Sequence, residues 1–162
     1  MILPDVLTYN LKIIFCGTAA SKQSKKLNAY YAGPGNKFWK TLHEIELTEK
    51  LLKPQEFKKL LDFNIGLTDI CKTDYGNDNE LDTSKYDVDG FTLKILEYKP
   101  KIVCFNGKNA AKSYLNQKKV DYGYQDKRVG DSKIFIAPST SGAANGFWDI
   151  DIWRNIVNSL NV

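Results

Sequence analysis

Polar side chains that can take part in chemistry follow several apolar segments of this chain. Asp69 ends one such segment, Asn106 ends another, and Asn36 follows a Gly-Pro-Gly turn. A carboxylate can stabilise positive charge and orient or deprotonate a water molecule, and an amide can hold a water molecule or a ligand edge. Each residue also has a structural explanation, because Asp and Asn are common in turns and Asn is a frequent helix N-cap.

An aromatic pair precedes the same turn. Tyr30 and Tyr31 are adjacent, and Gly33-Pro34-Gly35 follows closely. A flat ring beside a rigid turn suits a planar ligand such as a nucleobase, although loop tyrosines also commonly pack on a core. Stacking a base on an aromatic ring contributes about 1–3 kcal/mol. Either tyrosine could take this role, and we prefer Tyr30 on motif alignment.

Short apolar runs alternate with segments of helical periodicity along the chain, which indicates an α/β fold. We expect a single domain over residues 1–162, a three-layer α/β/α sandwich around a four-stranded, mainly parallel sheet. The expected strands are 11–16, 64–70, 102–105 and 133–137. The expected helices begin at Asn36, Pro54, Asp87 or Asp89, Asn109 and Trp148. Residues 73–86 read as an exposed loop, 122–132 as a polar connector, and the lysine-rich segment after Ser21 as a loop.

In an open parallel sheet, ligands bind beyond the carboxyl ends of the strands. The residues that leave those ends here are 17–21, 68–69, 106–108 and 138–141, all small, polar or glycine-containing. The tyrosine segment follows the first of these exits and can fold over the same edge. We therefore expect a cavity with one aromatic wall and polar groups opposite, suited to a planar group that forms hydrogen bonds.

Composition excludes several classes of protein. With 43% hydrophobic and 26% charged residues, the chain has ordinary globular composition, and it contains no apolar run of membrane-spanning length. Its one histidine, His43, rules out a histidine metal cluster, and Cys16, Cys71 and Cys104 lack metal-type spacing. Buried free thiols in the cytoplasm are the expected state of these cysteines. The net charge of +4 permits contact with phosphates without requiring it.

Four segments together resemble the uracil-DNA glycosylase superfamily, in particular its mismatch-specific and thymine-DNA glycosylase branch. They are Phe15-Cys-Gly17, Gly33-Pro-Gly-Asn-Lys-Phe-Trp-Lys40, Gly66-Leu-Thr-Asp69 and Pro138-Ser-Thr-Ser-Gly-Ala143. The resemblance implies a monofunctional enzyme that flips a deaminated or mismatched base out of DNA and hydrolyses its N-glycosidic bond. We expect the protein to be a monomer. It implies no metal and no cofactor.

The first motif departs from this pattern. The branch resembles Gly-x-Asn-Pro-Gly there, with an asparagine that positions the attacking water, whereas this chain has Gly17-Thr-Ala-Ala-Ser21. Ala19 cannot bind water through its side chain, so Asp69 or Asn36 would have to replace it. The hypoxanthine-specific members are similar in their Tyr-Tyr-Gly-type loop and in a segment that resembles Phe105-Asn-Gly-Lys108. The base is therefore open between uracil and hypoxanthine, with thymine opposite G a further option.

The resemblance also implies roles for individual residues. The catalytic pair would be Asp69 and Asn36, and the base would contact Thr18, Tyr30 and Asn106. The residues expected to contact DNA, duplex or single-stranded, are Ser21, Lys108, Ser139, Thr140, Ser141 and Gly142, and residues 142–146 would enter the minor groove. Two alternatives stay open: a relative that lost activity with the Ala19 site and only binds DNA, and a nucleotide-handling α/β domain whose 17–21 turn holds a phosphate. The second alternative lacks a Gly-x-Gly-x-x-Gly pattern.

Overall fold

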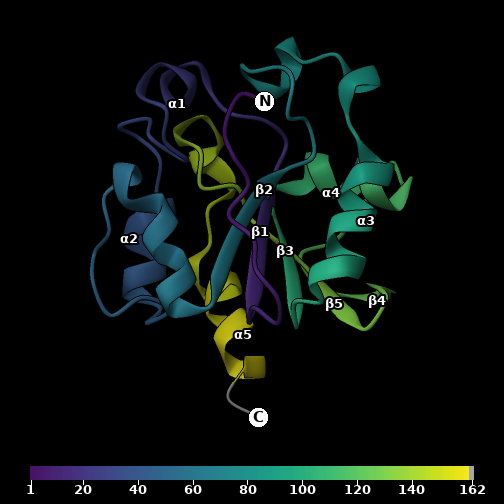
Figure 1. Ribbon diagram of the computed structural model, residues 1–162. Helices are drawn as coiled ribbons and strands as arrows, with labels where there is room; N and C mark the ends of the chain where they lie inside the picture. The colour runs from purple at the N-terminus through teal and green to yellow at the C-terminus, as the bar shows by residue number, and fades with distance from the viewer. Residues whose placement is uncertain (161–162) are drawn as a thin grey trace.

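A five-stranded sheet lies between two layers of helices in the computed structural model, which describes residues 1–160 (Figure 1). The strands run in the order β2-β1-β3-β5-β4. All neighbouring pairs are parallel except β4 and β5, which are antiparallel. The strands are β1 (Ile13–Gly17), β2 (Ile65–Asp69), β3 (Ile102–Asn106), β4 (Gly123–Val129) and β5 (Ser132–Ala137). The predicted α/β class and the four predicted strands are confirmed.

The fifth strand corrects the prediction of a polar connector over 122–132. β4 forms an edge hairpin with β5, and its side chains are mostly exposed or half-buried, so its sequence carries no apolar run. The hairpin turns through Gly130, whose φ of 58° lies in the left-handed region that a tight two-residue turn requires. An edge strand exposed to solvent lacks the apolar run that identifies a buried strand in the sequence.

Helices cover both faces of the sheet (Figure 1). One face packs against α2 (Phe38–Glu44), the 3₁₀ segment η1 (Pro54–Phe63) and α5 (Ile150–Leu160), and the other against α3 (Val88–Tyr98) and α4 (Lys108–Leu115). Strand alternation feeds both cores: Phe15 of β1 contributes to the first and Ile14 to the second. The fold is therefore the expected layered arrangement.

The amino-terminal segment closes the outer edge of β2. Val6 and Leu67 exchange two backbone hydrogen bonds of 2.9 Å in an antiparallel bridge. Gly66 permits this approach, because a Cβ there would stand 2.5 Å from the carbonyl oxygen of Val6. Gly66 weakens the strand pattern of β2 in the sequence, but it is required because the amino-terminal segment packs against this edge of the sheet.

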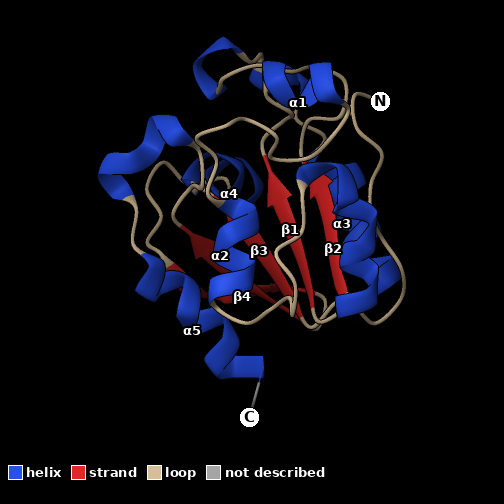
Figure 2. Ribbon diagram, turned by 90° about the vertical axis from the view of Figure 1, so that its left-hand side faces the viewer, coloured by secondary structure: helices blue, strands red, loops and turns tan. Residues whose placement is uncertain are grey.

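The carboxyl ends of the parallel strands share one edge of the sheet. In Figure 2 the arrowheads of β1 and β2 point toward α1 (Lys22–Leu27), a helix in the segment predicted as a loop. Ser21 caps it by accepting a hydrogen bond of 3.0 Å from the backbone of Ser24. Without apolar periodicity, this short lysine-rich helix gave no sequence signal.

Candidate active site

A cavity of about 970 Å³ opens at the carboxyl edge of the sheet. All four predicted strand exits and the tyrosine segment contribute to its lining. The predicted site residues that line it are Thr18, Ser21, Tyr30, Asn36, Asp69, Asn106, Lys108, Ser139, Thr140 and Ser141. Gly142 stands outside that lining and packs against Gly35, whose Cα would lie 3.4 Å from a Cβ on Gly142. The structure thus brings together side chains that are up to 123 positions apart in the sequence.

Asp69 and Tyr31 face each other across Gly17. Gly17 and Asp69 are paired at the ends of β1 and β2. A Cβ on Gly17 would stand 2.9 Å from Asp69 Oδ1 and 3.3 Å from Tyr31 Oη. Glycine is therefore needed here to make room for the two oxygens, and all three residues line the cavity.

The Asp69 carboxyl group is buried, with 5% of its residue surface exposed. Burial raises its pKa to about 6, because the charged form loses hydration, and the Asp5 carboxylate adds to the rise. Lys72 and Lys94 oppose it with their positive charge, and Gly17 opposes it with a backbone hydrogen bond. Asp69 is consequently a mainly ionised carboxylate near neutral pH, in the range useful for accepting a proton.

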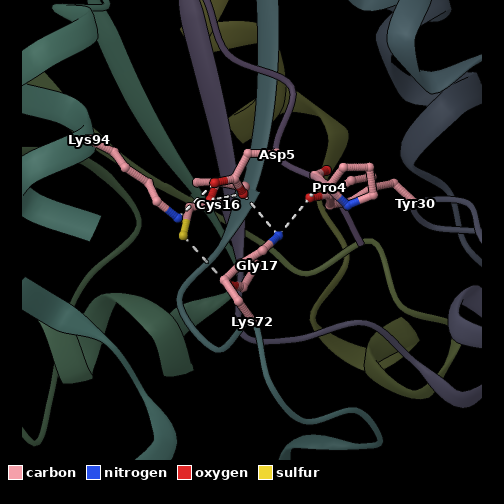
Figure 3. Close-up of polar contacts among 8 residues, drawn as sticks. Pro4, Asp5, Cys16, Gly17, Tyr30, Lys72 and Lys94 are labelled. Carbon is pink, nitrogen blue, oxygen red and sulfur yellow. Dashed lines mark hydrogen bonds and ion pairs between the residues drawn. The ribbon is translucent and has the colours of Figure 1, made fainter. Parts of the chain in front are cut away.

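Asp5, Lys72 and Lys94 form a half-buried charge cluster (Figure 3). Asp5 pairs with Lys72 Nζ at 2.9 Å and with Lys94 Nζ at 2.7 Å, and it accepts a hydrogen bond of 2.7 Å from Thr68. Burial works against ionisation of Asp5, but the two lysines and Thr68 leave its pKa below the ordinary value. Lys72 also donates to Tyr30 Oη at 3.0 Å. The cluster therefore ties the amino-terminal segment to the tyrosine loop.

The two tyrosines have different environments, which corrects our preference for Tyr30 as the stacking residue. Tyr30 is only 2% exposed, packs edge-on against Phe57, and donates a hydrogen bond of 3.0 Å to the carbonyl of Pro4. Tyr31 is half-buried, stacks on Phe38 with ring centroids 4.1 Å apart, and has a φ of 52°. Both tyrosines line the cavity, and local sequence does not reveal the left-handed backbone at Tyr31.

Asn36 combines a capping role with a position on the cavity wall. The N-cap residue of α2 is Lys37, one position later than predicted, but Asn36 Oδ1 still accepts a hydrogen bond of 3.0 Å from the backbone N–H of Phe38 at the start of that helix. The amide nitrogen is left for a ligand. Ala19 lines the same cavity and presents only a methyl group.

Asn106 is held by Thr140 through two reciprocal hydrogen bonds of 3.0 Å. Asn106 Nδ2 donates to Thr140 Oγ1, and the backbone N–H of Thr140 donates to Asn106 Oδ1. Thr140 is 1% exposed, which corrects its predicted role as a phosphate contact: it anchors the amide of Asn106 instead. Ser139 and Ser141 remain on the wall, and Ser139 Oγ accepts a hydrogen bond of 3.2 Å from Ser141 N.

The polar loop over 73–86 contributes a residue that the sequence analysis missed. Asp78 lies at the cavity mouth and accepts hydrogen bonds from Thr18 Oγ1 at 2.6 Å and from Asn109 Nδ2 at 2.5 Å. It therefore links the exit of β1 to the start of α4. Nearby, Lys108 places its Nζ 4.4 Å from the ring centroid of Tyr122. The sequence of this polar loop has no hydrophobic periodicity, so it does not predict the hydrogen bonds that Asp78 forms with distant residues.

The remaining titratable residues give no sign of a metal centre. His43 lies outside this cavity, with its Nδ1 3.4 Å from the carbonyl oxygen of Thr48. Within residues 1–160, no three His, Cys, Asp or Glu side chains are grouped so as to bind a metal ion.

Cys16, Cys71 and Cys104 are buried free thiols, as predicted. None of the helices described here has the length and apolar character needed to cross a membrane.

Comparison with known proteins identifies the family. The profile of the uracil DNA glycosylase superfamily matches residues 4–154. The chain belongs to that superfamily. A solution NMR structure of a Methanosarcina acetivorans protein, provisionally described as a uracil DNA glycosylase, is similar with a TM-score of 0.69 and 25% sequence identity. The match covers 99% of this chain and 97% of that one. Superfamily membership supports a DNA glycosylase function in general, a hydrolase activity with DNA as the partner.

Proposed function

We propose that this protein is a monofunctional DNA glycosylase that removes a deaminated base, uracil or hypoxanthine, by hydrolysis, as a monomer without metal or cofactor. The observation that carries the proposal is the convergence of Asp69, Asn36 and Asn106 on one cavity beside Tyr31. Carboxylate, amide and aromatic groups in a cavity at the carboxyl edge of a parallel sheet suit a nucleobase. The cavity volume of about 970 Å³ has room for a base with its sugar.

Binding begins with extrusion of the nucleotide from the DNA stack, which costs a few kcal/mol and less at a mismatch. Contact with an aromatic ring returns about 1–3 kcal/mol. We assign this contact to Tyr31, which borders the cavity with Phe38 packed on one face of its ring and would meet the base with its hydroxyl-bearing edge. Asn106, held rigid by Thr140, would contact the polar edge of the base.

Hydrolysis develops positive charge on the sugar and negative charge on the departing base. An ionised Asp69 would stabilise the first charge and orient the attacking water, and the amide of Asn36 would hold that water from the wall. This pair replaces the side chain that Ala19 lacks. Support for Asp69 comes from its burial, which strengthens its electrostatic effect, and from a pKa of about 6 that leaves it ionised at neutral pH.

The surface around the cavity mouth would contact the DNA backbone. Ser21, Ser139, Ser141 and Lys108 line this mouth and can donate hydrogen bonds to phosphates. The segment Gly142–Phe147 follows them and ends in Phe147, an aromatic side chain that is 73% exposed. We assign Phe147 the role of an apolar wedge that fills the space left by the flipped base, a use of exposed apolar side chains known from minor-groove proteins.

The test is excision from oligonucleotides that carry one G·U, A·U, G·T or hypoxanthine pair, together with the single-stranded versions. Duplexes with normal pairs serve as controls, and alkali converts each abasic site into a strand break. We expect cleavage of uracil- or hypoxanthine-containing DNA. Binding to these oligonucleotides without release of any base would refute the proposal and favour a DNA-binding relative, an alternative suggested by Ala19 at the wall of the cavity.

A further inference from the structure

The hydroxyl group of Tyr31 is buried in the candidate active site without a hydrogen-bond partner among residues 1–160. It is the hydroxyl that faces Asp69 across Gly17, in the lining of the cavity. Folding alone does not account for it. A phenylalanine would pack equally well on Phe38, and burying an unpartnered hydroxyl is unfavourable.

The backbone at Tyr31 adds a second unfavourable feature. Its φ of 52° lies in the left-handed region, which a bulky residue seldom adopts. Tyr30 shows the ordinary alternative, since its hydroxyl donates to Pro4 and accepts from Lys72. Local strain combined with an orphaned polar atom is typical of a functional position. Both features at Tyr31 therefore point to a ligand atom that meets its Oη.

The reaction needs a hydrogen-bond donor at this place. The departing base takes the electron pair of its glycosidic bond, so its carbonyl oxygens become more negative as the bond breaks. Lys72 is paired with Asp5, and the Asn106 amide gives one of its two hydrogens to Thr140. His43 is not in the cavity lining. The Tyr31 hydroxyl is a neutral donor that lines the cavity, and none of its possible acceptors among residues 1–160 forms a hydrogen bond with it.

We propose that Tyr31 is a catalytic residue whose hydroxyl donates a hydrogen bond to a carbonyl oxygen of the flipped base and stabilises the negative charge that forms there. This inference rests on the proposed glycosylase function. In the step, the water oxygen bonds to C1′ of the sugar while the bond from C1′ to the base nitrogen breaks. The electron pair leaves with the base, and the water proton passes to Asp69. Tyr31 keeps its own proton. Burial, with the Asp69 charge, raises the pKa of Tyr31 well above the ordinary value, although the nearby Asn106 amide, which can donate to the Tyr31 oxygen, opposes the rise. The hydroxyl therefore keeps its proton and stays a donor.

The Tyr31→Phe variant removes only the hydroxyl, and Tyr30→Phe is a matched control in the neighbouring residue. Single-turnover excision is measured with both, alongside the melting temperature and binding to a non-cleavable substrate analogue. We expect Tyr31→Phe to lower the rate by about 100-fold, the effect of losing one oxyanion donor, without lowering the melting temperature or binding. We expect Tyr30→Phe to keep the wild-type rate while its melting temperature falls, because that hydroxyl has two partners. A wild-type rate in Tyr31→Phe would overturn the proposal.

A substrate with a different leaving group tests whether the Tyr31 hydroxyl acts on the departing base. Fluorine on uracil, or on hypoxanthine if the enzyme prefers the purine, helps the ring carry the negative charge. The defect of Tyr31→Phe should therefore shrink with the fluorinated base. An equal defect with both bases would place the hydroxyl elsewhere in the reaction and overturn the assignment. If the wild-type protein releases neither base, the proposed function itself fails, which is a different result from a normal wild type with an unaffected Tyr31→Phe.

Discussion

Asp69→Asn should make the protein more stable and less active at neutral pH. Burial gives the Asp69 carboxyl a pKa of about 6 in the folded protein, against an ordinary value of 3.8. This increase in the pKa corresponds to about 3 kcal/mol of unfavourable free energy for the ionised form of Asp69 in the folded protein. The residue is 5% exposed, so solvent screening does little to reduce this figure. The neutral amide of asparagine avoids the penalty and keeps nearly the same shape.

The sign of the pH dependence follows from the raised pKa. Between about pH 4 and pH 6 the unfolded chain loses the Asp69 proton first, so the wild-type free energy of unfolding falls as pH rises. The stabilisation by Asp69→Asn should therefore be near zero at pH 4 and approach about 3 kcal/mol above pH 6. Denaturant unfolding of both proteins at a series of pH values measures it. Stabilisation that does not grow with pH would refute the burial argument.

The same variant tests the chemistry. We expect Asp69→Asn to lower the excision rate at least about tenfold, a barrier increase on the order of 1.4 kcal/mol. The wild-type rate should fall as pH decreases through about 6, as the Asp69 carboxylate is protonated. A full rate in Asp69→Asn would remove Asp69 from the mechanism even if the stability result held.

Asp5→Asn is the matched control, because this carboxyl has the opposite shift. Lys72 and Lys94 keep the pKa of Asp5 below its ordinary value although burial opposes them. The Asp5 carboxylate therefore stabilises the protein at pH values above its pKa in the unfolded chain. This stabilisation is lost as the pH falls through its lower pKa in the folded protein. Asp5→Asn should therefore destabilise the protein at neutral pH and have less effect in acid. The same sign of change in both variants would show that the two environments have been misjudged.

Three further variants test the remaining parts of the site. Asn36→Ala should lower the excision rate at least about tenfold by removing the amide that holds the water, and single-turnover kinetics will show whether it does. Gly17→Ala should destabilise the protein by about 1–3 kcal/mol in denaturant unfolding, since its Cβ would stand 2.9 Å from Asp69 Oδ1 and 3.3 Å from Tyr31 Oη; an unchanged midpoint would contradict the close packing. Phe147→Ala should leave the melting temperature unchanged, because the side chain is 73% exposed, and should slow excision from duplex more than from single-stranded DNA. Equal slowing on both substrates would argue against a wedge.

Much of the architecture follows from the sequence by itself. The four parallel strands are short buried apolar runs, and buried parallel strands have that composition because both of their faces are covered. Pro54 and the Asp87 cap mark helix starts where the structure has them. Since parallel strands end at one edge, the position of the site followed from the exits of those strands.

Only the tertiary structure decided how individual site residues are used. Tyr30 and Tyr31 are adjacent, have the same chemistry and both border the cavity. The hydroxyl of Tyr30 is bound by Pro4 and Lys72, whereas that of Tyr31 has no hydrogen-bond partner among residues 1–160. Burial of Thr140 against Asn106 likewise turned a predicted DNA contact into an anchor. These outcomes depend on long-range packing, and short sequence patterns do not contain it.

For Asp69, the sequence predicted the position of the side chain, and the tertiary structure determined its charge. Its place at the end of an apolar strand predicted that it would reach the site edge, where it pairs with Gly17. Its pKa depends on desolvation by the surrounding core and on Lys72, which the amino-terminal Asp5 holds in place. The order of residues therefore placed the carboxylate, and the folded environment set its protonation, because the electrostatic energy of a charge depends on everything packed around it.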